Sequence, residues 1–401
     1  MGRRTPSNEF RPGEGVLSFQ VRLRPISRIS SAAFALLSIL AISVGPARAL
    51  SQDAPVRTFG AEPTCSNCRL DLEHIGIIAD SDDDPWMGED IFVSQDRHGR
   101  FYATSFDASP GVVSVIDRSG QRVDRFGRQG EGPGEGRWVR PPAFRGDTAY
   151  VYDPMLGRMT VWSPGPGREV LRTMRVPARL RNWMILDSGE LIMTGLLNTR
   201  DAIGYPVHVV TDDRVTRSFG NQSPAFRADA AALSDRRVAL SNGGRLWIAH
   251  RRRYVIELWN IHGTKLRELR VDADWFPPWD GERTDLDTQI PPPQVNAIRE
   301  DDTGLLWVFV HVADENFHEN RRQLEDSGTG MGPIVRPWDR SDLRDTIVHV
   351  IDPKEGIVAA ARFDRYLFIT HPDGPLLSSR LGPDLQLIRD AYRVNLVRPT
   401  P

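Results

Sequence analysis

A turn-and-strand unit that recurs along most of the chain is the feature that most limits its fold. Each copy has a strand, a turn rich in Asp, Asn and Gly, a second strand with alternating apolar residues, a longer loop, and a further strand that ends in another turn. The copy around Asn242-Gly243-Gly244 is the clearest, with strands expected at 246–248, 254–259 and 266–271. Short β-branched and aromatic runs separated by such turns predict an all-β protein.

Five copies of the unit can be followed by the turns that come after their first strands. These turns lie at 96–99, 146–147, 187–189, 242–244 and 302–304. Their spacing of roughly 40 to 60 residues is close to the length of a propeller blade with insertions. Each unit is then one four-stranded blade. Stacking such blades in a ring buries their faces and shelters their edges.

A sixth blade is expected to combine two distant parts of the chain. Segments 366–369, 376–377 and 385–394 supply three strands, and 70–78 supplies the fourth. Pairing of the N-terminal and C-terminal strands in this last blade would close the ring. We therefore predict an all-β fold, a six-bladed β-propeller, with a seven-bladed ring or a sandwich as the alternatives.

A glycine-rich segment after the first copy carries a resemblance to known proteins. Phe126-Gly127-Arg128-Gln129-Gly130-Glu131-Gly132-Pro133-Gly134-Glu135, together with the repeated unit, resembles the six-bladed propellers of the NHL-repeat and TolB-like group of exported bacterial proteins. The likeness covers about residues 60–395. It implies a binding or scaffold module, although relatives include sugar-lactone hydrolases and amide lyases. A shared fold implies a shape more than a reaction.

The same glycine-rich region has two interpretations. Backbone N–H groups of the loop at 128–140 would suit an anion, but the loop lacks the following helix and the Lys-Ser/Thr of a phosphate loop. A tight connection with positive φ explains the glycines without a ligand. We favour the tight connection.

The first 49 residues have the layout of a secretory signal peptide. Three arginines precede an apolar run at 32–44, and Ala47-Arg48-Ala49 follows as a cleavage site. The run is shorter than the roughly 20 residues that cross a bilayer, so no transmembrane span is expected after cleavage. The predicted organisation is a signal peptide at 1–49, an N-terminal segment at 50–69, a propeller at 70–395 and a tail at 396–401. The protein would be extracytoplasmic, either periplasmic or secreted.

Cys65 and Cys68 are the two cysteines of the chain. Outside the cytoplasm, a disulfide between them is the ordinary expectation. A redox pair would need a preceding strand and a helix start, and a zinc site would need further ligands besides the nearby His74. Both remain alternatives.

The charge balance bears on the class of partner. After residue 49, 51 acidic residues stand against 44 basic ones. This balance lacks the basic excess that nucleic-acid binding needs, so we expect no nucleic-acid partner. Lys265 and Lys354 are the only lysines. A GC-rich genome explains the preference for arginine, and fixed ion pairs or carboxylate recognition are the alternative.

The longest departure from the repeat is an insertion at 312–344 in the fifth blade. Inserted loops often carry function because the blades hold them rigidly. We expect one mouth of the ring to bind a protein, peptide, glycan or small ligand through aromatic and imidazole side chains. The candidates on or near these loops are Trp275, Trp279, His311, His318 and Trp338.

The alternative function is a metal-dependent, lactonase-like hydrolase or lyase at the central channel. A divalent cation there would activate water and polarise a carbonyl. Its candidate ligands lie near the starts of inner strands or in their turns: Glu89, Asp187, Asn242 and Asp302. Their recurrence at one blade position is equally typical of turn formers. Because no nucleophile motif or defined carboxylate pair is recognisable, we assign no catalytic residue. We expect a binding protein without a cofactor rather than an enzyme.

Overall fold

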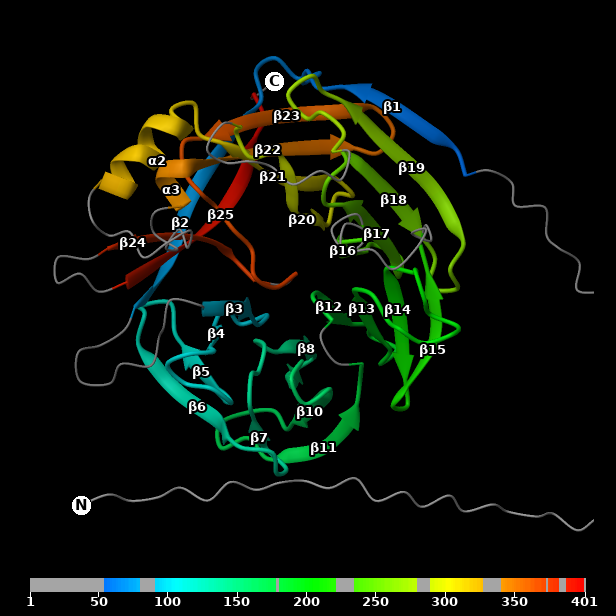
Figure 1. Cartoon of the computed structure of the whole chain (residues 1–401), viewed down its shortest axis with the longest axis vertical. Coiled ribbons are helices and arrows are strands. Elements are labelled where there is room, and N and C mark those ends of the chain that lie inside the picture. The colour runs from blue at the N-terminus through cyan, green and yellow to red at the C-terminus, as the bar shows by residue number, and fades with distance from the viewer. Residues whose placement is uncertain are drawn as a thin grey trace, which may run out of the picture. The chain divides into compact units, whose positions relative to one another are not determined.

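The computed structural model describes residues 54–79, 91–177, 180–220, 234–279, 289–326, 340–372, 374–381 and 387–399. The predicted signal peptide, Glu89 and Trp338 lie outside these residues. The described strands form six sheets, which surround a common centre as the blades of a propeller (Figure 1). The predicted six-bladed all-β fold is therefore confirmed.

The first three blades follow the chain order from the centre outward. Blade one contains β3 (Ile91–Gln95), β4 (Phe101–Ser105), β5 (Val112–Ile116), β6 (Arg122–Gln129) and β7 (Glu135–Gly136). Blade two contains β8 (Ala143–Arg145), β9 (Thr148–Asp153), β10 (Arg158–Trp162) and β11 (Val170–Arg175). Blade three contains β12 (Trp183–Ile185), β13 (Leu191–Thr194), β14 (Val207–Thr211) and β15 (Arg214–Phe219).

The other three blades include strands from the N-terminal part of the chain. Blade four contains β16 (Arg236–Ser241), β17 (Arg245–His250), β18 (Val255–Trp259), β19 (Lys265–Asp272) and, parallel to β19, β1 (Val56–Gly60). Blade five contains β20 (Gln294–Glu300), β21 (Leu306–Ala313), β22 (Arg344–Asp352) and β23 (Gly356–Phe363). Blade six contains β24 (Leu376–Leu381), β25 (Leu387–Val397) and β2 (Arg69–Ala79).

The last blade joins both ends of the described chain. Strand β2 pairs antiparallel with β25 from Arg69↔Val397 to Ala79↔Ile388, which is the strand pairing expected from the sequence. The innermost position, predicted as a strand at 366–369, is reduced to a single bridge between Phe368 and Leu377. This segment therefore lines the centre of the ring with little regular pairing of its own.

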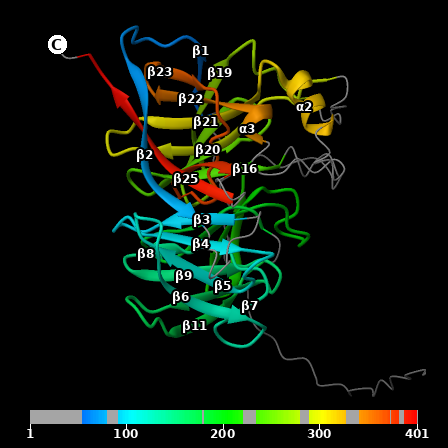
Figure 2. The same cartoon turned by 90° about the vertical axis from the view of Figure 1, so that its left-hand side faces the viewer.

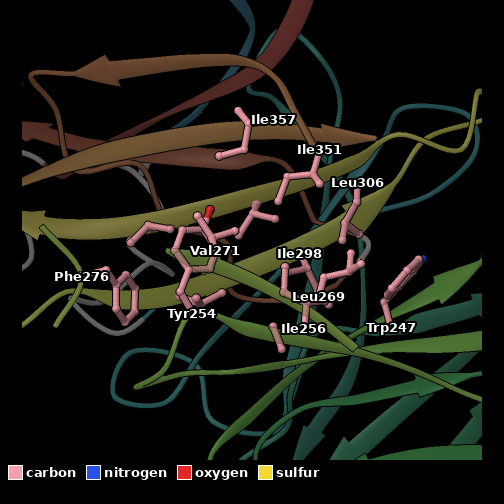
Figure 3. Packing of buried hydrophobic residues seen from close by; sticks show 14 of the residues in the cluster. Trp247, Tyr254, Ile256, Leu269, Val271, Phe276, Ile298, Leu306, Ile351 and Ile357 are labelled. Carbon is pink, nitrogen blue, oxygen red and sulfur yellow. The ribbon is translucent and has the colours of Figure 1, made fainter. Parts of the chain in front are cut away.

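Packing between blades explains why the sheets assemble. Among the described residues, the buried apolar side chains form six clusters, one between each pair of neighbouring blades. Between blades four and five, Ile256 and Leu269 pack against Ile298 and Leu306 (Figure 3). Alternate residues of each strand face opposite neighbours, and full burial of such a side chain stabilises the fold by about 1.5–3 kcal/mol.

The glycine-rich loop after β6 is a tight connection, as favoured from the sequence. Gly127, Gly130 and Gly134 have φ of 81°, 149° and 74°. The carboxylate of Glu135 accepts hydrogen bonds from the backbone N–H of Gly132 (2.7 Å) and from Arg128 (2.8 Å). The loop thus binds an anion supplied by its own chain.

The fifth-blade insertion contains helices where the sequence analysis expected a polar loop. Helices α2 (Phe317–Asp326) and α3 (Arg340–Leu343) lie between β21 and β22, at one face of the ring (Figure 2). Asp314 starts α2 by accepting the backbone N–H of Asn316 (2.7 Å), and Phe317 is buried. A mostly polar sequence gives too weak a periodicity to predict a helix.

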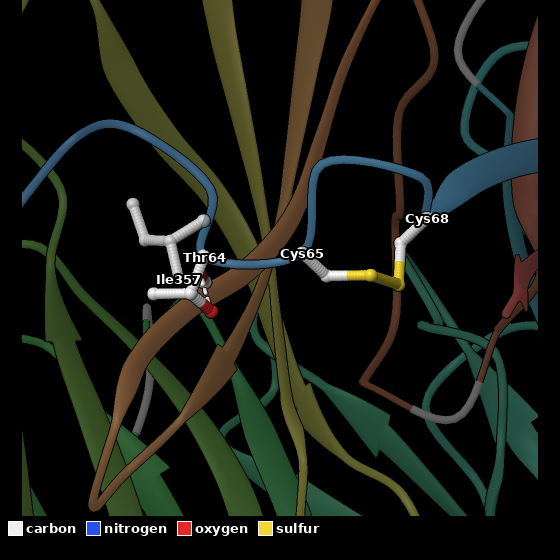
Figure 4. Close-up of a disulfide and its surroundings, with 4 residues drawn as sticks. All are labelled: Thr64, Cys65, Cys68 and Ile357. Atoms are coloured by element: carbon white, nitrogen blue, oxygen red, sulfur yellow. Dashed lines mark hydrogen bonds between the residues drawn. A yellow bond between two sulfur atoms is a disulfide. The ribbon is translucent and has the colours of Figure 1, made fainter. Parts of the chain in front are cut away.

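The N-terminal segment runs along the outside of three blades. After β1 on blade four, the backbone N–H of Thr64 donates to Ile357 O on blade five (2.8 Å), and β2 follows on blade six. A disulfide links Cys65 and Cys68 between these last two contacts (Figure 4). The expected disulfide is therefore present in the structure.

Candidate ligand-binding cavity in the central channel

A cavity of about 410 Å³ lies at the centre of the ring. We call it the channel cavity. All six blades contribute side chains to it, in blade order Phe92, Arg140, Trp183, Asp235, Asn296 and Tyr366. Its volume suits a small molecule rather than a folded partner.

The cavity lies at the end of the ring where the inner strands begin. Trp183 starts β12, Asp235 directly precedes β16, and Asn296 is near the start of β20. The turns that follow the inner strands lie at the opposite end. Because β21 runs antiparallel to β20, the β21–β22 insertion lies at the cavity end.

Three arginines converge on one carboxylate in this cavity. Both oxygens of Asp235 are used: Oδ1 accepts from Arg237 Nη1 (2.8 Å), and Oδ2 accepts from Arg251 Nη1 (2.7 Å) and Arg181 Nη1 (3.0 Å). The Asp235 side chain is only 2% exposed. We call these four residues the arginine cluster. It holds three positive charges for one negative charge.

The backbone fixes the arginine cluster in place. Arg251 N–H donates to Asp235 O (3.2 Å), and Arg237 Nε donates to Asn296 O (2.6 Å). Burial acts to raise the pKa of Asp235, but the charges of Arg237, Arg251 and Arg181 outweigh burial and hold the pKa at about 2. Burial lowers the pKa of Arg237 despite its pairing with Asp235. The cluster is therefore preorganised, with excess positive charge.

Two further arginines line the cavity. Arg140 lies over the rings of Phe92 (3.9 Å) and Trp138 (4.6 Å), which fixes its guanidinium by cation–π contacts. Arg389, on β25, is 1% exposed. Among the described lining residues, five arginines thus accompany a single carboxylate.

Aromatic side chains form another part of the lining. Tyr366 and Phe368 stack with ring centroids 5.3 Å apart and an interplanar angle of 27°. Their segment is held against blade five, because Leu367 O lies 2.7 Å from His311 Nε2 and Leu367 N–H donates to Thr346 Oγ1 (2.8 Å). The Tyr366 and Phe368 side chains are each half-buried.

Several N–H donors in the lining have no hydrogen-bond partner among the described residues. They are Trp183 Nε1, Arg251 Nε and Asn296 Nδ2. Trp183 is 2% exposed, so bulk water does not readily satisfy its indole N–H. A buried donor without an acceptor destabilises a protein by about 1–3 kcal/mol, so these groups point to a bound acceptor or to ordered water.

The predicted ligand-binding residues are placed differently from the expectation. Trp275 packs on the core between blades four and five, and Trp279 lies 5.2 Å from the Arg252 guanidinium. His318 is exposed on α2. His311 is buried behind the cavity wall, and burial lowers its pKa to about 3. None of these four is among the described residues that line the channel cavity. His311 supports the aromatic lining through Leu367 and Tyr366, with its ring 4.4 Å from that of Tyr366.

The structure does not bring together the three predicted metal ligands that lie among the described residues. Asp187, Asn242 and Asp302 are exposed in the turns of three separate blades, at the end of the ring opposite the cavity. Asn242 donates through Nδ2 to Asp301 O (2.8 Å), which links its turn to the turn of the neighbouring blade. In the described part of the chain, the three-carboxylate group close enough to hold an ion is instead Asp314, Asp345 and Asp364, beside the insertion. Arg362 Nε already donates to Asp345 there (2.6 Å).

A second buried charge cluster lies on blade four. Glu257 and Glu268 face each other on β18 and β19, and Lys265 Nζ contacts both, at 3.5 and 2.7 Å. Arg270 Nε donates to Glu268 (2.7 Å), and Trp259 Nε1 donates to Glu257 (3.1 Å). We call this the glutamate cluster. It borders a cavity of about 970 Å³, but its two acidic and two basic side chains balance.

The sequence analysis missed the arginine cluster, although a signal was present. Ser234-Asp235-Arg236-Arg237 and His250-Arg251-Arg252-Arg253 flank two strands that the repeat identifies as neighbours. Genome composition explains the overall preference for arginine, with fixed ion pairs or carboxylate recognition as the alternative, and that interpretation singles out neither run. Pairing of β16 with β17 brings the two runs together at the channel.

None of the described helices has both the length and the apolar character needed to cross a membrane.

No family model matches the chain, and no curated protein matches it either. Solved structures do show the fold. A DUF4221 family member from Bacteroides vulgatus is 10% identical, with a TM-score of 0.54 over 82% of this chain and 99% of that one.

A protein of Bacteroides fragilis described as exported is also 10% identical, with a TM-score of 0.51 over 85% of this chain and 99% of that one. A virginiamycin B lyase from Staphylococcus aureus has a TM-score of 0.39, which supports no functional argument. These similarities concern the fold alone. The chain is a six-bladed β-propeller, consistent with the resemblance to the NHL-repeat and TolB-like group.

Proposed function

We propose that the protein is an extracytoplasmic binding module that takes an anionic ligand in its channel cavity. The observation that carries this proposal is the arginine cluster, in which Asp235 accepts hydrogen bonds from three arginines. Excess positive charge in a partly buried site is unfavourable unless an anion compensates it. Arginine also presents several N–H donors in a planar fork that matches a carboxylate or another oxyanion.

The donors without partners support the same ligand chemistry. Trp183 Nε1, Arg251 Nε and Asn296 Nδ2 are all donors, so the group that satisfies them must accept hydrogen bonds. The Asp235 oxygens are already occupied by arginines. An incoming oxyanion would complete the hydrogen bonding of the cavity.

Preorganisation supports binding by a preformed site. Arg237 is fixed by Asp235 and Asn296 O, and Arg140 is fixed by two aromatic rings. Side chains that are already ordered lose little entropy when a ligand binds. The fifth-blade insertion lies at the same end of the ring as the cavity, where a larger partner would approach.

We also propose that the protein is exported. The layout of residues 1–49 is that of a signal peptide, and the Cys65–Cys68 disulfide suits an oxidising compartment. The predicted boundaries of the signal peptide, propeller and tail stand as part of this proposal. The hydrolase alternative has less support, because the carboxylate found among the described lining residues is already bound by arginines.

Thermal unfolding in the presence of anions tests the proposal. At constant ionic strength, sulfate, phosphate or benzoate should raise the melting temperature of the purified protein above its value in chloride, because a ligand that binds the folded state stabilises it. Arg251→Gln should reduce this increase, whereas Arg214→Gln, an exposed arginine on β15, should not. An equal response in the wild type and Arg251→Gln to every anion would contradict the proposal.

A further inference from the structure

The channel cavity has two unlike walls. Arg181, Arg237 and Arg251 come from blades three and four. Tyr366 and Phe368 come from blade six, which also contributes Arg389 through β25, while Phe92 of blade one lies under the Arg140 guanidinium. In a ring of six blades, blades six and one lie opposite blades three and four. A ligand in the cavity therefore lies between two walls. We call Arg181, Arg237 and Arg251 the arginine wall, and Tyr366 and Phe368 the aromatic wall.

The aromatic wall is rigid. Tyr366 stacks on Phe368 from one side, and the His311 ring lies 4.4 Å from Tyr366. Thr370 Oγ1 donates to Val93 O (3.0 Å) and accepts from Val93 N–H (2.7 Å), which ties the same segment to blade one. Aromatic residues fixed in this way offer a stacking surface with little further loss of entropy.

The balance of donors and acceptors separates two classes of ring-bearing acid. Each hydroxyl group of a sugar acid both accepts and donates hydrogen bonds, and each O–H donor needs an acceptor in the site. The carboxylate available among the described lining residues, Asp235, is engaged through both oxygens, while three N–H donors lack partners. An aryl carboxylate brings acceptors at one end and no donor at the other, so it matches this lining better.

We infer that the ligand of the channel cavity is an aryl carboxylate, with its carboxylate on the arginine wall and its ring against Tyr366 and Phe368. This inference rests on the proposed anion-binding function. The cavity volume of about 410 Å³ accommodates one or two fused aromatic rings with a carboxylate. Inorganic anions would use the arginine wall alone and leave the aromatic wall uncovered.

Calorimetric titration with three probes tests the inference. We expect 2-naphthoate to bind the purified protein about tenfold more tightly than inorganic phosphate or glucuronate, because only naphthoate buries a ring on the aromatic wall. Phe368→Leu should weaken naphthoate binding several-fold and leave phosphate binding unchanged. Tyr366→Leu is the second variant of the same wall. Melting temperatures close to that of the wild type would show that each variant is folded.

The outcomes separate this inference from the proposed function. If phosphate binds as tightly as naphthoate, and Arg251→Gln weakens both, the anion site stands and the aryl carboxylate is wrong. If glucuronate binds most tightly, the ligand class is instead an acidic sugar. If none of the three probes binds in the wild type, or Arg251→Gln leaves all three affinities unchanged, the proposed function itself fails.

Discussion

The arginine cluster and the glutamate cluster are two buried charge networks on or beside the same blade, and they differ in balance. Asp235 has three arginine partners, whereas Lys265 bridges Glu257 and Glu268, and Arg270 pairs with Glu268. Each carboxylate in both networks is less than a tenth exposed. The larger cavity borders the glutamate cluster, yet its charges already compensate one another.

On this difference we assign the glutamate cluster to structure and propose the arginine cluster for binding. A balanced network satisfies its own members and fixes the strands that carry them. A network with excess charge and donors without partners needs a bound acceptor or ordered water to complete its hydrogen bonds. Cavity size alone would favour the glutamate cluster instead.

Among the substitutions, the largest effect on folding is expected for Asp235→Asn. Removing this charge leaves three arginines without their common anion, and breaking a buried ion pair on one side costs about 3–5 kcal/mol. We expect the low end, about 3 kcal/mol, because Arg181 is more than half exposed. Urea unfolding measures the change, with Asp187→Asn in an exposed turn as control. A loss of stability no greater than that of the control would contradict the central role of Asp235 in the arginine cluster.

Glu257→Gln should destabilise the fold less and leave the channel unchanged. Glutamine keeps an acceptor for Trp259 but loses the charge that faces Lys265, so we expect a loss of about 2 kcal/mol. Anion affinity in the channel cavity should equal that of the wild type. Weakened binding would show that the two networks are coupled, contrary to their separate roles.

The two charge networks and the buried histidines should lose their contributions to stability over different pH ranges. The pKa values of Asp235 and Glu257 are about 2, below their unfolded values, so their stabilisation is present above pH 4 and is lost as the pH falls towards 2. Burial lowers the pKa of His311 to about 3 and that of His349 to about 4.

Below about pH 6.5 the unfolded chain binds protons at these histidines and the native protein does not, so stability should already fall between pH 6 and 4, by up to about 1.4 kcal/mol per pH unit for each histidine. Urea unfolding at pH 7, 5.5 and 4.5 checks this window, and His349→Gln should flatten the slope. A flat profile down to pH 4 would contradict the burial of neutral histidines.

The smallest expected effects on stability come from removing one cation from each network. Arg251→Gln removes one charge from an excess, so without ligand it should change stability by less than about 0.5 kcal/mol. Lys265→Gln removes a cation from a balanced pair and should cost about 1 kcal/mol, since the side chain is a quarter exposed. A larger loss of stability for Arg251→Gln than for Lys265→Gln would contradict the distinction between the two networks.

The repeated turns made the fold predictable, whereas the site depended on ring closure. Asn242-Gly243-Gly244 and the alternating residues at 246–259 identify a blade without its neighbours, because turn conformation and strand periodicity are local properties. Arg181, Asp235 and Phe368 meet only because the six blades curve into one ring. No local pattern predicts contacts between residues so far apart in the chain. The ligand contacts expected from the sequence lie on the tryptophan loops instead.

Crystals grown with 4-iodobenzoate offer the most direct test of the account. The anomalous signal of iodine locates the ring, and the carboxylate can then be placed in the density. We predict the carboxylate within hydrogen-bond distance of Arg251 or Arg237 and the iodine on the side of Tyr366 and Phe368. Iodobenzoate bound elsewhere, with only water beside the arginine cluster, would contradict a binding role for the channel.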